Sequence, residues 1–310
     1  MSRSLLLLAG YMLIGGLTPV FGKWAVAEIP WGMLAWFRFG IAGSLLAMTL
    51  RLRGRKLPVT RANLKSFLGV ALLCVPLNQL SFLIGLKFAN ASHAGIFYAM
   101  NPVLVFWGGV LLGQSVFRLE LFWASMLSFG GAALVTLSTG EGGGWSIDPK
   151  MLTGDLLLLM AIVTWSTFSL LSKPLIAKHG ALATLASVFL LGTLMQTPFA
   201  VWDFVHHIGA MSITSRGVLG FGYLTLITSY VNYMLWYVVI DRHELTKTSV
   251  LVNANFLITI FFGWLFQGDQ VNALFVVGGA CTLLGIVLVI RDRLISRNRS
   301  VNRDRNVERA

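Results

Sequence analysis

Hydrogen-bonding side chains recur inside long apolar segments of the chain, where a polar group that faces lipid without a partner is costly. Asn78 and Gln79 are adjacent in one such segment, and Asn232 and Tyr233 are adjacent in another. Amides beside aromatic rings suit a small amphipathic solute better than an inorganic ion. The sequence therefore predicts a substrate-binding site formed by Asn78, Gln79, Phe82, Tyr98, Asn101, Trp165, Ser169, Ser229, Asn232, Tyr233 and Trp236.

One helix face in the second half carries much of this predicted site. Its members fall three, four and seven residues after the first, which is the spacing of one α-helical face: Ser229, Asn232, Tyr233 and Trp236. We expect this face to line a solute cavity. The alternative interpretation is that these residues make polar contacts between packed helices and that the aromatic rings pack in the helix interface.

Ionisable side chains are scarce inside the apolar segments. Arg38 lies within the second segment, and His93 lies at the start of the fourth. No Asp or Glu lies in the middle of a predicted span, since Glu28 and Asp155 fall at span edges and Asp269 falls in a loop. Proton movement through a membrane usually needs a group that titrates there, and His93 is the available candidate. An interfacial histidine with no role in gating or coupling is the alternative.

Arg38 could act in two ways. Its side chain is long enough to reach the nearer membrane interface from roughly 10 Å inside the segment. It could instead hold a carboxylate-bearing substrate or an opposing backbone carbonyl. Both interpretations stay open at this point.

Two lysines occupy matching places at the ends of apolar segments. Lys23 ends the first segment and Lys173 ends the sixth. Anchoring at the membrane interface explains them, and closing a gate at each end of a cavity is the sharper hypothesis. Pro19 and Pro102 supply places where the gating helices could bend.

The apolar segments themselves are long enough to cross a bilayer, which requires about 20 residues each. Over half of the 310 residues are apolar and only 12% are charged. Cys74 and Cys281 lie inside apolar runs, so we expect no disulfide, no metal site and no cofactor. The predicted spans are about 4–22, 31–50, 66–86, 93–113, 120–138, 153–172, 182–202, 216–239, 247–266 and 272–291.

Positive charge is distributed as expected for a membrane protein with cytoplasmic termini. Nineteen of the 24 Lys and Arg residues then fall on the cytoplasmic side and four on the other. The basic clusters at 51–65 and 291–309 flank apolar spans, so the net charge of +12 does not indicate a nucleic-acid partner. A membrane enzyme would need a cluster of catalytic groups. The local cluster of groups that could act in catalysis is Asp203 with His206-His207, and we interpret it as a solvated loop.

The chain also repeats itself. At an offset of 150 residues Lys23 falls on Lys173, and at an offset of 154 Asn78 falls on Asn232 and Asn101 on Asn255. Because each half contains five predicted helices, the second half must enter the membrane from the opposite face. Inverted repeats are typical of secondary transporters, whose substrate site lies where the halves meet. We therefore expect a transporter.

Two stretches carry a resemblance to a known family. GLKFANASHAGIFYAMNPVLVFWGGVLLGQSV (85–116) and GDLLLLMAIVTWSTFSLLSK (154–173) resemble the drug/metabolite transporter superfamily, in its ten-helix branch with two EamA-type repeats. The resemblance spans about residues 5–291 and implies outward movement of amino acids or related metabolites. Gln114 and Gln267 stand where members often have glutamate, and Asn255-Phe256 where a proline is usual.

The sequence thus predicts an all-α integral membrane protein of the cell (inner) membrane, with ten transmembrane helices as two inverted five-helix repeats. The repeats would occupy residues 1–145 and 150–295, followed by a basic cytoplasmic tail at 296–310. We expect facilitated transport of a small-molecule substrate by alternating access, and no enzymatic activity. A proton-coupled drug or metabolite antiporter is the alternative, and a membrane-embedded enzyme the alternative of another class. The sequence predicts no particular oligomeric state.

Overall fold

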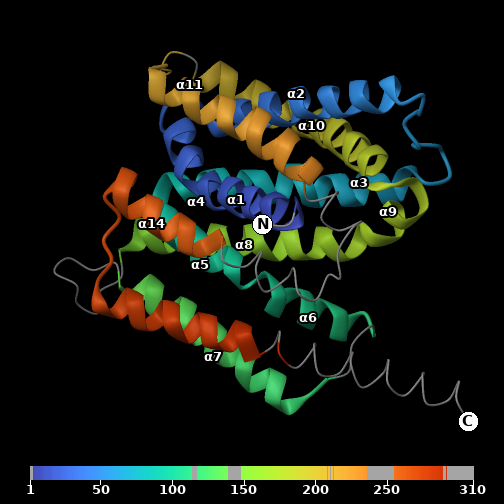
Figure 1. Ribbon diagram of the computed structural model, residues 1–310. Coiled ribbons are helices and arrows are strands. Elements are labelled where there is room, and N and C mark those ends of the chain that lie inside the picture. Colours follow the sequence, from blue (N-terminus) through green and yellow to red (C-terminus); the bar gives the residue numbers. More distant parts are fainter. Residues whose placement is uncertain are drawn as a thin grey trace, which may run out of the picture.

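The computed structural model of the chain describes residues 3–113, 117–138, 148–207, 209, 211, 213–235, 255–288 and 291 (Figure 1). These residues form helices and contain no β-strand. The first half contains α1 (Arg3–Glu28), α2 (Trp31–Leu52), α3 (Leu64–Leu72), the π-helical segment η1 (Leu73–Leu77), α4 (Asn78–Phe88), α5 (Ala91–Ala99), α6 (Asn101–Leu111) and α7 (Leu119–Leu137). The second half contains α8 (Pro149–Leu171), α9 (Lys173–His179), α10 (Ala181–His207), α11 (Ser215–Gly222), the π-helical segment η4 (Tyr223–Asn232), α14 (Asn255–Gln267) and a last helix, Ala273–Leu288.

The described helices confirm the all-helical membrane architecture. Seven helices in the described part of the chain are long and apolar enough to cross a membrane. They include α3, η1 and α4 joined in line as Leu64–Phe88, and α5 joined to α6 as Ala91–Leu111. Because α14 and Ala273–Leu288 are apolar but shorter, the count of ten spans stays a prediction.

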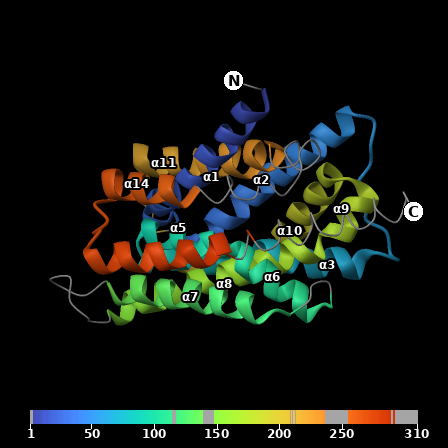
Figure 2. The same ribbon diagram turned by 60° about the horizontal axis from the view of Figure 1, so that its bottom comes forward.

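The helices run side by side, so the bundle has two ends (Figures 1 and 2). At one end, here called the Glu28 end, the backbone N–H of Gly32 donates to Asp203 over 2.6 Å, which joins the start of α2 to the end of α10. The Glu28 carboxylate accepts hydrogen bonds there from Thr214, just before α11. The other end, here called the Arg51 end, contains the end of α2 and the start of α3, where Phe67 lies beside His179.

The two halves run in opposite directions. α1 ends at the Glu28 end, where the Lys23 ammonium donates to the carbonyl of Ala89 at the end of α4. α8, the counterpart of α1 in the second half, begins at that same end, because Gly154 in its first turns packs directly against Ala89. The inversion inferred from the helix count is therefore present in the described helices.

The packing between the halves follows the same symmetry. α1 packs on α11 and η4, and its counterpart α8 packs on α4 and η1. α5 packs on α14, the counterpart of α6, and two further helices pack on their own counterparts: α2 on α10, and α7 on Ala273–Leu288. The last pair forms one edge of the bundle in both ribbon views (Figures 1 and 2).

The contact of α7 with the last helix is close because glycine lies at two equivalent points. A Cβ atom on Gly131 would lie 2.4 Å from the backbone nitrogen of Thr282, and one on Gly285 would lie 2.4 Å from the carbonyl of Ala124. Small residues let helices approach in lipid, where no hydrophobic force draws them together. The two glycines are 154 residues apart, which is the offset of the sequence repeat.

Two spans contain π-helical turns at matching positions. In the third span η1 contains Pro76, which has no N–H to donate and so removes one regular helical hydrogen bond. η1 ends directly before Asn78, and η4 ends at Asn232. Turns of this type often occur at functional sites. The two asparagines matched by the repeat are thus placed by the same backbone irregularity.

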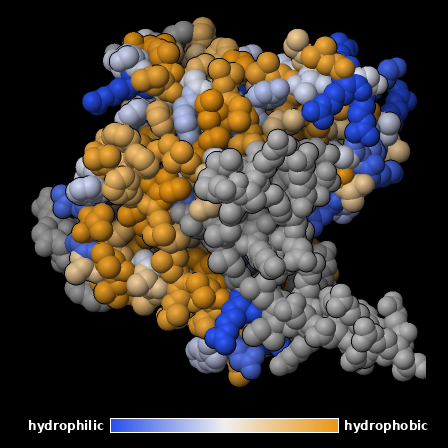
Figure 3. Space-filling view, viewed as in Figure 1, coloured by the Kyte–Doolittle hydropathy of each residue, from blue (hydrophilic) through white to orange (hydrophobic). Residues whose placement is uncertain are grey.

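The surface agrees with a bundle immersed in lipid. Large apolar side chains, such as Phe37, Leu194 and Trp264, are exposed along the sides of the helices. In Figure 3 hydrophobic residues cover most of the coloured surface on the left and top of the visible face, while the largest group of hydrophilic residues lies over the Arg51 end at the upper right. That end carries the basic loop at 51–65.

Candidate functional site

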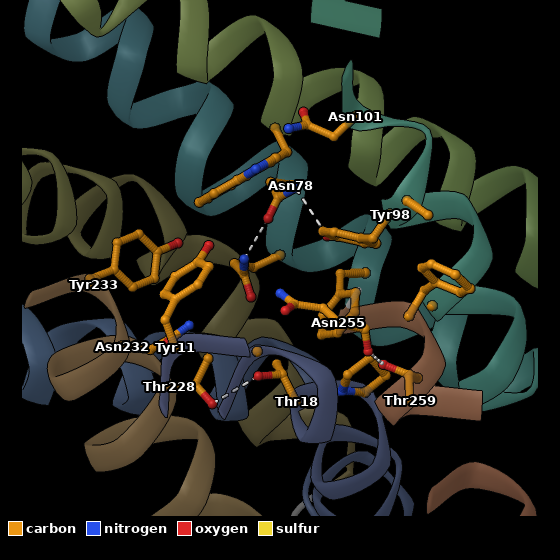
Figure 4. Close-up of a pocket in the computed structure, with 18 of the residues that line it drawn as sticks. Tyr11, Thr18, Asn78, Tyr98, Asn101, Thr228, Asn232, Tyr233, Asn255 and Thr259 are labelled. Carbon is orange, nitrogen blue, oxygen red and sulfur yellow. Dashed lines mark hydrogen bonds between the residues drawn. The ribbon is translucent and has the colours of Figure 1, made fainter. Parts of the chain in front are cut away.

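A cavity of about 170 Å³ lies inside the bundle, between the two halves of the chain. Its wall is formed by α1, α2, α4, α5, α8, η4 and α14 together with the residues that adjoin them (Figure 4). An apolar cavity of about 150 Å³ holds a benzene molecule, so the space suits a small organic solute. The lining residues are Tyr11, Gly15, Thr18, Pro19, Arg38, Asn78, Gln79, Phe82, Gly95, Tyr98, Ala99, Asn101, Trp165, Thr228, Asn232, Tyr233, Asn255, Phe256 and Thr259.

Four asparagines line this cavity as two pairs matched by the repeat. Asn78 pairs with Asn232, and Asn101 pairs with Asn255, each at an offset of 154 residues. Figure 4 shows the members of each pair approaching the cavity from different helices. The cavity therefore lies on the symmetry element that relates the two halves.

Asn78 is held by its neighbours. Its Nδ2 donates to the carbonyl of Ala161 over 2.6 Å and approaches the hydroxyl of Tyr98 at 3.5 Å. Its Oδ1 accepts from Gln79 Nε2. These contacts connect α4 with α8 and α5, so Asn78 fixes the cavity wall as well as lining it. Asn232 differs, because its Oδ1 is buried and has no hydrogen-bond partner in the described residues.

Among the residues that line the cavity, Arg38 is the one whose side chain carries a full charge at neutral pH. It is only 2% exposed. Its Nε donates to Ser229 over 2.6 Å, and its Nη1 donates to Gln79 Oε1 over 2.9 Å. The guanidinium thus bridges α2, α4 and η4. The alternative in which Arg38 extends to the membrane interface is wrong, because polar partners inside the bundle hold it.

Aromatic rings form the rest of the wall. The rings of Phe82 and Tyr98 meet edge-to-face with centroids 5.5 Å apart. Trp165 and Tyr233 meet in the same way at 5.8 Å. Because such pairs hold each other in place, the apolar surface of the cavity is preformed. A ligand with one polar and one apolar part would find a complement for each.

Comparison with known proteins shows the family to which the chain belongs. The sequence profile of the EamA-like transporter family matches residues 2–137 and 152–291, one match in each half. This chain belongs to the EamA-like transporter family. The protein is thus a membrane transporter by family, and the resemblance seen in the sequence is confirmed.

Relatives of this EamA-like transporter carry the same general description. An uncharacterized transporter of Archaeoglobus fulgidus is 26% identical over 288 residues, which cover 93% of this chain and 97% of that protein. The uncharacterized transporter YetK of Bacillus subtilis is 24% identical, covering 91% and 85%. A solved crystal structure matches the fold with a TM-score of 0.62 at 16% identity, covering 96% of this chain and 99% of that one.

Most of the side chains predicted to bind substrate in this EamA-like transporter lie at the cavity. Eight of them do: Asn78, Gln79, Phe82, Tyr98, Asn101, Trp165, Asn232 and Tyr233. Ser169 and Ser229 do not. Ser169 donates to the carbonyl of Trp165 in its own helix, and Ser229 accepts from Arg38 behind the wall. Trp236 lies outside the described residues.

Other cavity residues were missed by sequence reasoning. Thr18 and Thr228 face each other across the cavity wall with their hydroxyl oxygens 3.1 Å apart, and Thr259 donates to the carbonyl of Gly16. Threonine is common in apolar helices, so nothing in its spacing marked these positions. Asn255 did carry a signal, because the repeat matches it with Asn101.

A polar network lies at the Glu28 end of this EamA-like transporter. His93 Nδ1 lies 2.9 and 3.1 Å from the two carboxylate oxygens of Asp155, and both side chains are 2% exposed. Ser92 donates to Asp269 through its N–H and its hydroxyl. Asp155, which the sequence places at a span edge, is thus buried against His93. Neither His93 nor Asp155 lines the cavity.

The gating candidates differ in their surroundings. Lys23 Nζ donates to the carbonyl of Ala89 over 2.9 Å and to Asn90 Oδ1 over 3.2 Å, which ties α1 to the junction of α4 and α5. Lys173 is exposed at the Arg51 end, with no hydrogen bond or ion pair to the part of the chain that the structure describes. Pro19 lines the cavity within α1, and Pro102 lies in the first turn of α6, directly after the interruption of the fourth span at Met100.

Proposed function

We propose that this EamA-like transporter moves small amphipathic metabolites, such as amino acids, by alternating access around the cavity between its repeats. The observation that supports this most directly is the lining of one cavity by repeat-matched amides from both halves. In transporters built from inverted repeats, substrate sites occupy this position, and rocking of one half against the other exposes the site to each side in turn.

The closed polar network at the Glu28 end supports the alternating mechanism. Lys23 and the His93–Asp155 pair join α1, α4, α5 and α8 there. Opening this end requires these contacts to separate. We propose that the Glu28 end faces away from the cytoplasm, because the basic loop at 51–65 lies at the opposite end. The termini would then be cytoplasmic in a cell (inner) membrane, and net movement would be outward.

Our first mechanism is facilitated transport without a coupled ion. Among the residues that line the cavity, Arg38 is the one with a full charge, and it cannot carry a coupled proton because it stays protonated at working pH. A second candidate, proton-coupled antiport, is favoured by the buried His93–Asp155 pair. Histidine changes its charge in the physiological pH range, so protonation of His93 could change the strength of its contact with Asp155 at the Glu28 end.

Uptake of labelled amino acids into proteoliposomes tests the proposal, with and without an imposed proton gradient. Saturable uptake that is indifferent to the gradient would support a facilitator. Accumulation driven by the gradient, and lost in Asp155→Asn, would support the antiporter. Liposomes without protein and the variant Asp148→Asn, at an exposed helix cap, are the controls. No saturable uptake of any amino acid by well-folded protein would contradict the proposed substrates.

A further inference from the structure

Arg38 is a buried cation without an anionic partner in the described residues. The side chains around it that could carry charge are Tyr98, Tyr233 and Cys74, which are neutral at working pH. The buried carboxylates of the structure are engaged elsewhere: Asp155 with His93, Asp203 with Gly32, and Asp269 with Ser92. The cavity therefore contains a positive charge that the described protein does not neutralise.

The guanidinium also has unused donors. Arginine has five N–H groups, and here one on Nε and one on Nη1 are taken by Ser229 and Gln79. The second hydrogen of Nη1 and both hydrogens of Nη2 have no acceptor in the described part of the chain. A carboxylate can bind a guanidinium through two parallel hydrogen bonds, and both hydrogens of Nη2 are available here for such a pair or for a single charge-assisted bond.

A purely structural role explains this arrangement poorly. Ser229 and Gln79 are neutral, and a neutral side chain could bridge them without the cost of placing a charge in a membrane-spanning bundle. That cost is high for an ion without a counter-ion. A carboxylate entering the cavity would compensate the charge and satisfy the free hydrogens together.

We propose that Arg38 binds the carboxylate of the transported solute, so that the cavity selects carboxylate-bearing molecules over neutral and cationic ones of the same shape. This inference rests on the proposed function of the cavity as the substrate site. The aromatic wall formed by Phe82, Tyr98 and Trp165 receives the apolar part of the solute. The buried Oδ1 of Asn232, which has no partner among the residues that the structure describes, is an acceptor for a donor group on the solute.

Three probes with one phenylethyl skeleton test the proposal: 3-phenylpropionate, 3-phenylpropionamide and phenethylamine. Their binding to the purified full-length chain in detergent is measured by titration calorimetry. We expect 3-phenylpropionate to bind about 10-fold or more tightly than the amide, because a charge-assisted pair of hydrogen bonds replaces neutral ones. We expect no measurable binding of the amine. Equal binding of the acid and the amide would overturn the proposal.

Two variants assign the preference to Arg38. Arg38→Met should remove the preference for the acid while binding of the amide changes little. Gln79→Glu keeps Arg38 in place and puts a carboxylate on Nη1, where Gln79 Oε1 lies at 2.9 Å. It should also abolish the preference, and it decides the question if Arg38→Met does not fold. Arg51→Gln, an exposed position in the last turn of α2, is the control and should bind like the wild type.

The binding assay separates this inference from the transport proposal. If the acid binds through Arg38 but no solute crosses proteoliposomes, the transport proposal fails and carboxylate recognition stands. If solutes are transported and folded Gln79→Glu keeps the wild-type preference for the acid, carboxylate recognition by Arg38 fails and transport stands.

Discussion

Asn78 and Asn232 are matched by the repeat: Asn78 directly follows one π-helical segment, Asn232 ends the other, and both side chains line the same cavity. Their hydrogen bonding is not equivalent. Asn78 is bonded to Ala161 and Gln79, whereas Asn232 Oδ1 has no partner within the described residues. One asparagine therefore supports the wall, and the other presents an unused acceptor.

The difference between the two asparagines predicts different effects of the same substitution. Asn78→Ala should lower stability by about 1–3 kcal/mol, because the carbonyl of Ala161 and the Gln79 amide lose buried partners. Asn232→Ala should leave stability almost unchanged and should still reduce transport. Thermal unfolding in detergent and uptake into proteoliposomes measure the two effects. A larger loss of stability in Asn232→Ala than in Asn78→Ala would contradict this prediction.

Adjacent glycines in α7 provide a test of the helix contact at the edge of the bundle. Gly131→Ala should lower the unfolding temperature, because its Cβ would lie 2.4 Å from the Thr282 backbone nitrogen. Gly130→Ala should be neutral or slightly stabilising, since no atom of the described residues lies within 4 Å of its Cβ and alanine favours a helix by about 1 kcal/mol. Equal unfolding temperatures for the two variants would show that α7 and the last helix do not pack as described.

The buried His93–Asp155 pair should contribute more to stability than an exposed carboxylate in the same helix. Asp155→Ala leaves His93 buried without its partner and should cost about 2–4 kcal/mol. Asp148→Ala removes the N-terminal cap of α8, where the carboxylate accepts from Lys150, and should cost about 1 kcal/mol. Denaturant titration of the two variants compares them directly. A greater cost for Asp148→Ala would argue against the buried pair.

The two repeat-matched lysines should differ in their effect on transport. Lys23→Gln weakens the link from α1 to Ala89 and Asn90, so the Glu28 end should open more readily and the maximal uptake rate should change at least about twofold. Lys173→Gln alters an exposed side chain and should have a smaller effect. Initial rates of saturable uptake provide the measurement. If both variants transport with wild-type kinetics, Lys23 does not gate.

The sequence by itself determined the membrane architecture, because the apolar length of each segment and the charges that flank it are local properties. The repeat offset also matched Asn78 with Asn232 and Asn101 with Asn255, and all four lie at the cavity, although Asn255 was not predicted to bind substrate. Repeat symmetry in sequence requires symmetry in space once the halves pack together. These results needed no knowledge of which helices are neighbours.

The tertiary structure decided which side chains face inward. The α-helical spacing placed Ser229 on one face with Asn232, but η4 is a π-helix, whose i→i+5 hydrogen bonds widen each turn. Thr228 therefore lines the cavity, and Ser229 lies behind the wall on Arg38. Arg38 could reach an interface or the interior from the same backbone position, and only its partners on α4 and η4 resolved this. Burial of Asp155 against His93 likewise depends on how α5 packs on α8, which no local pattern encodes.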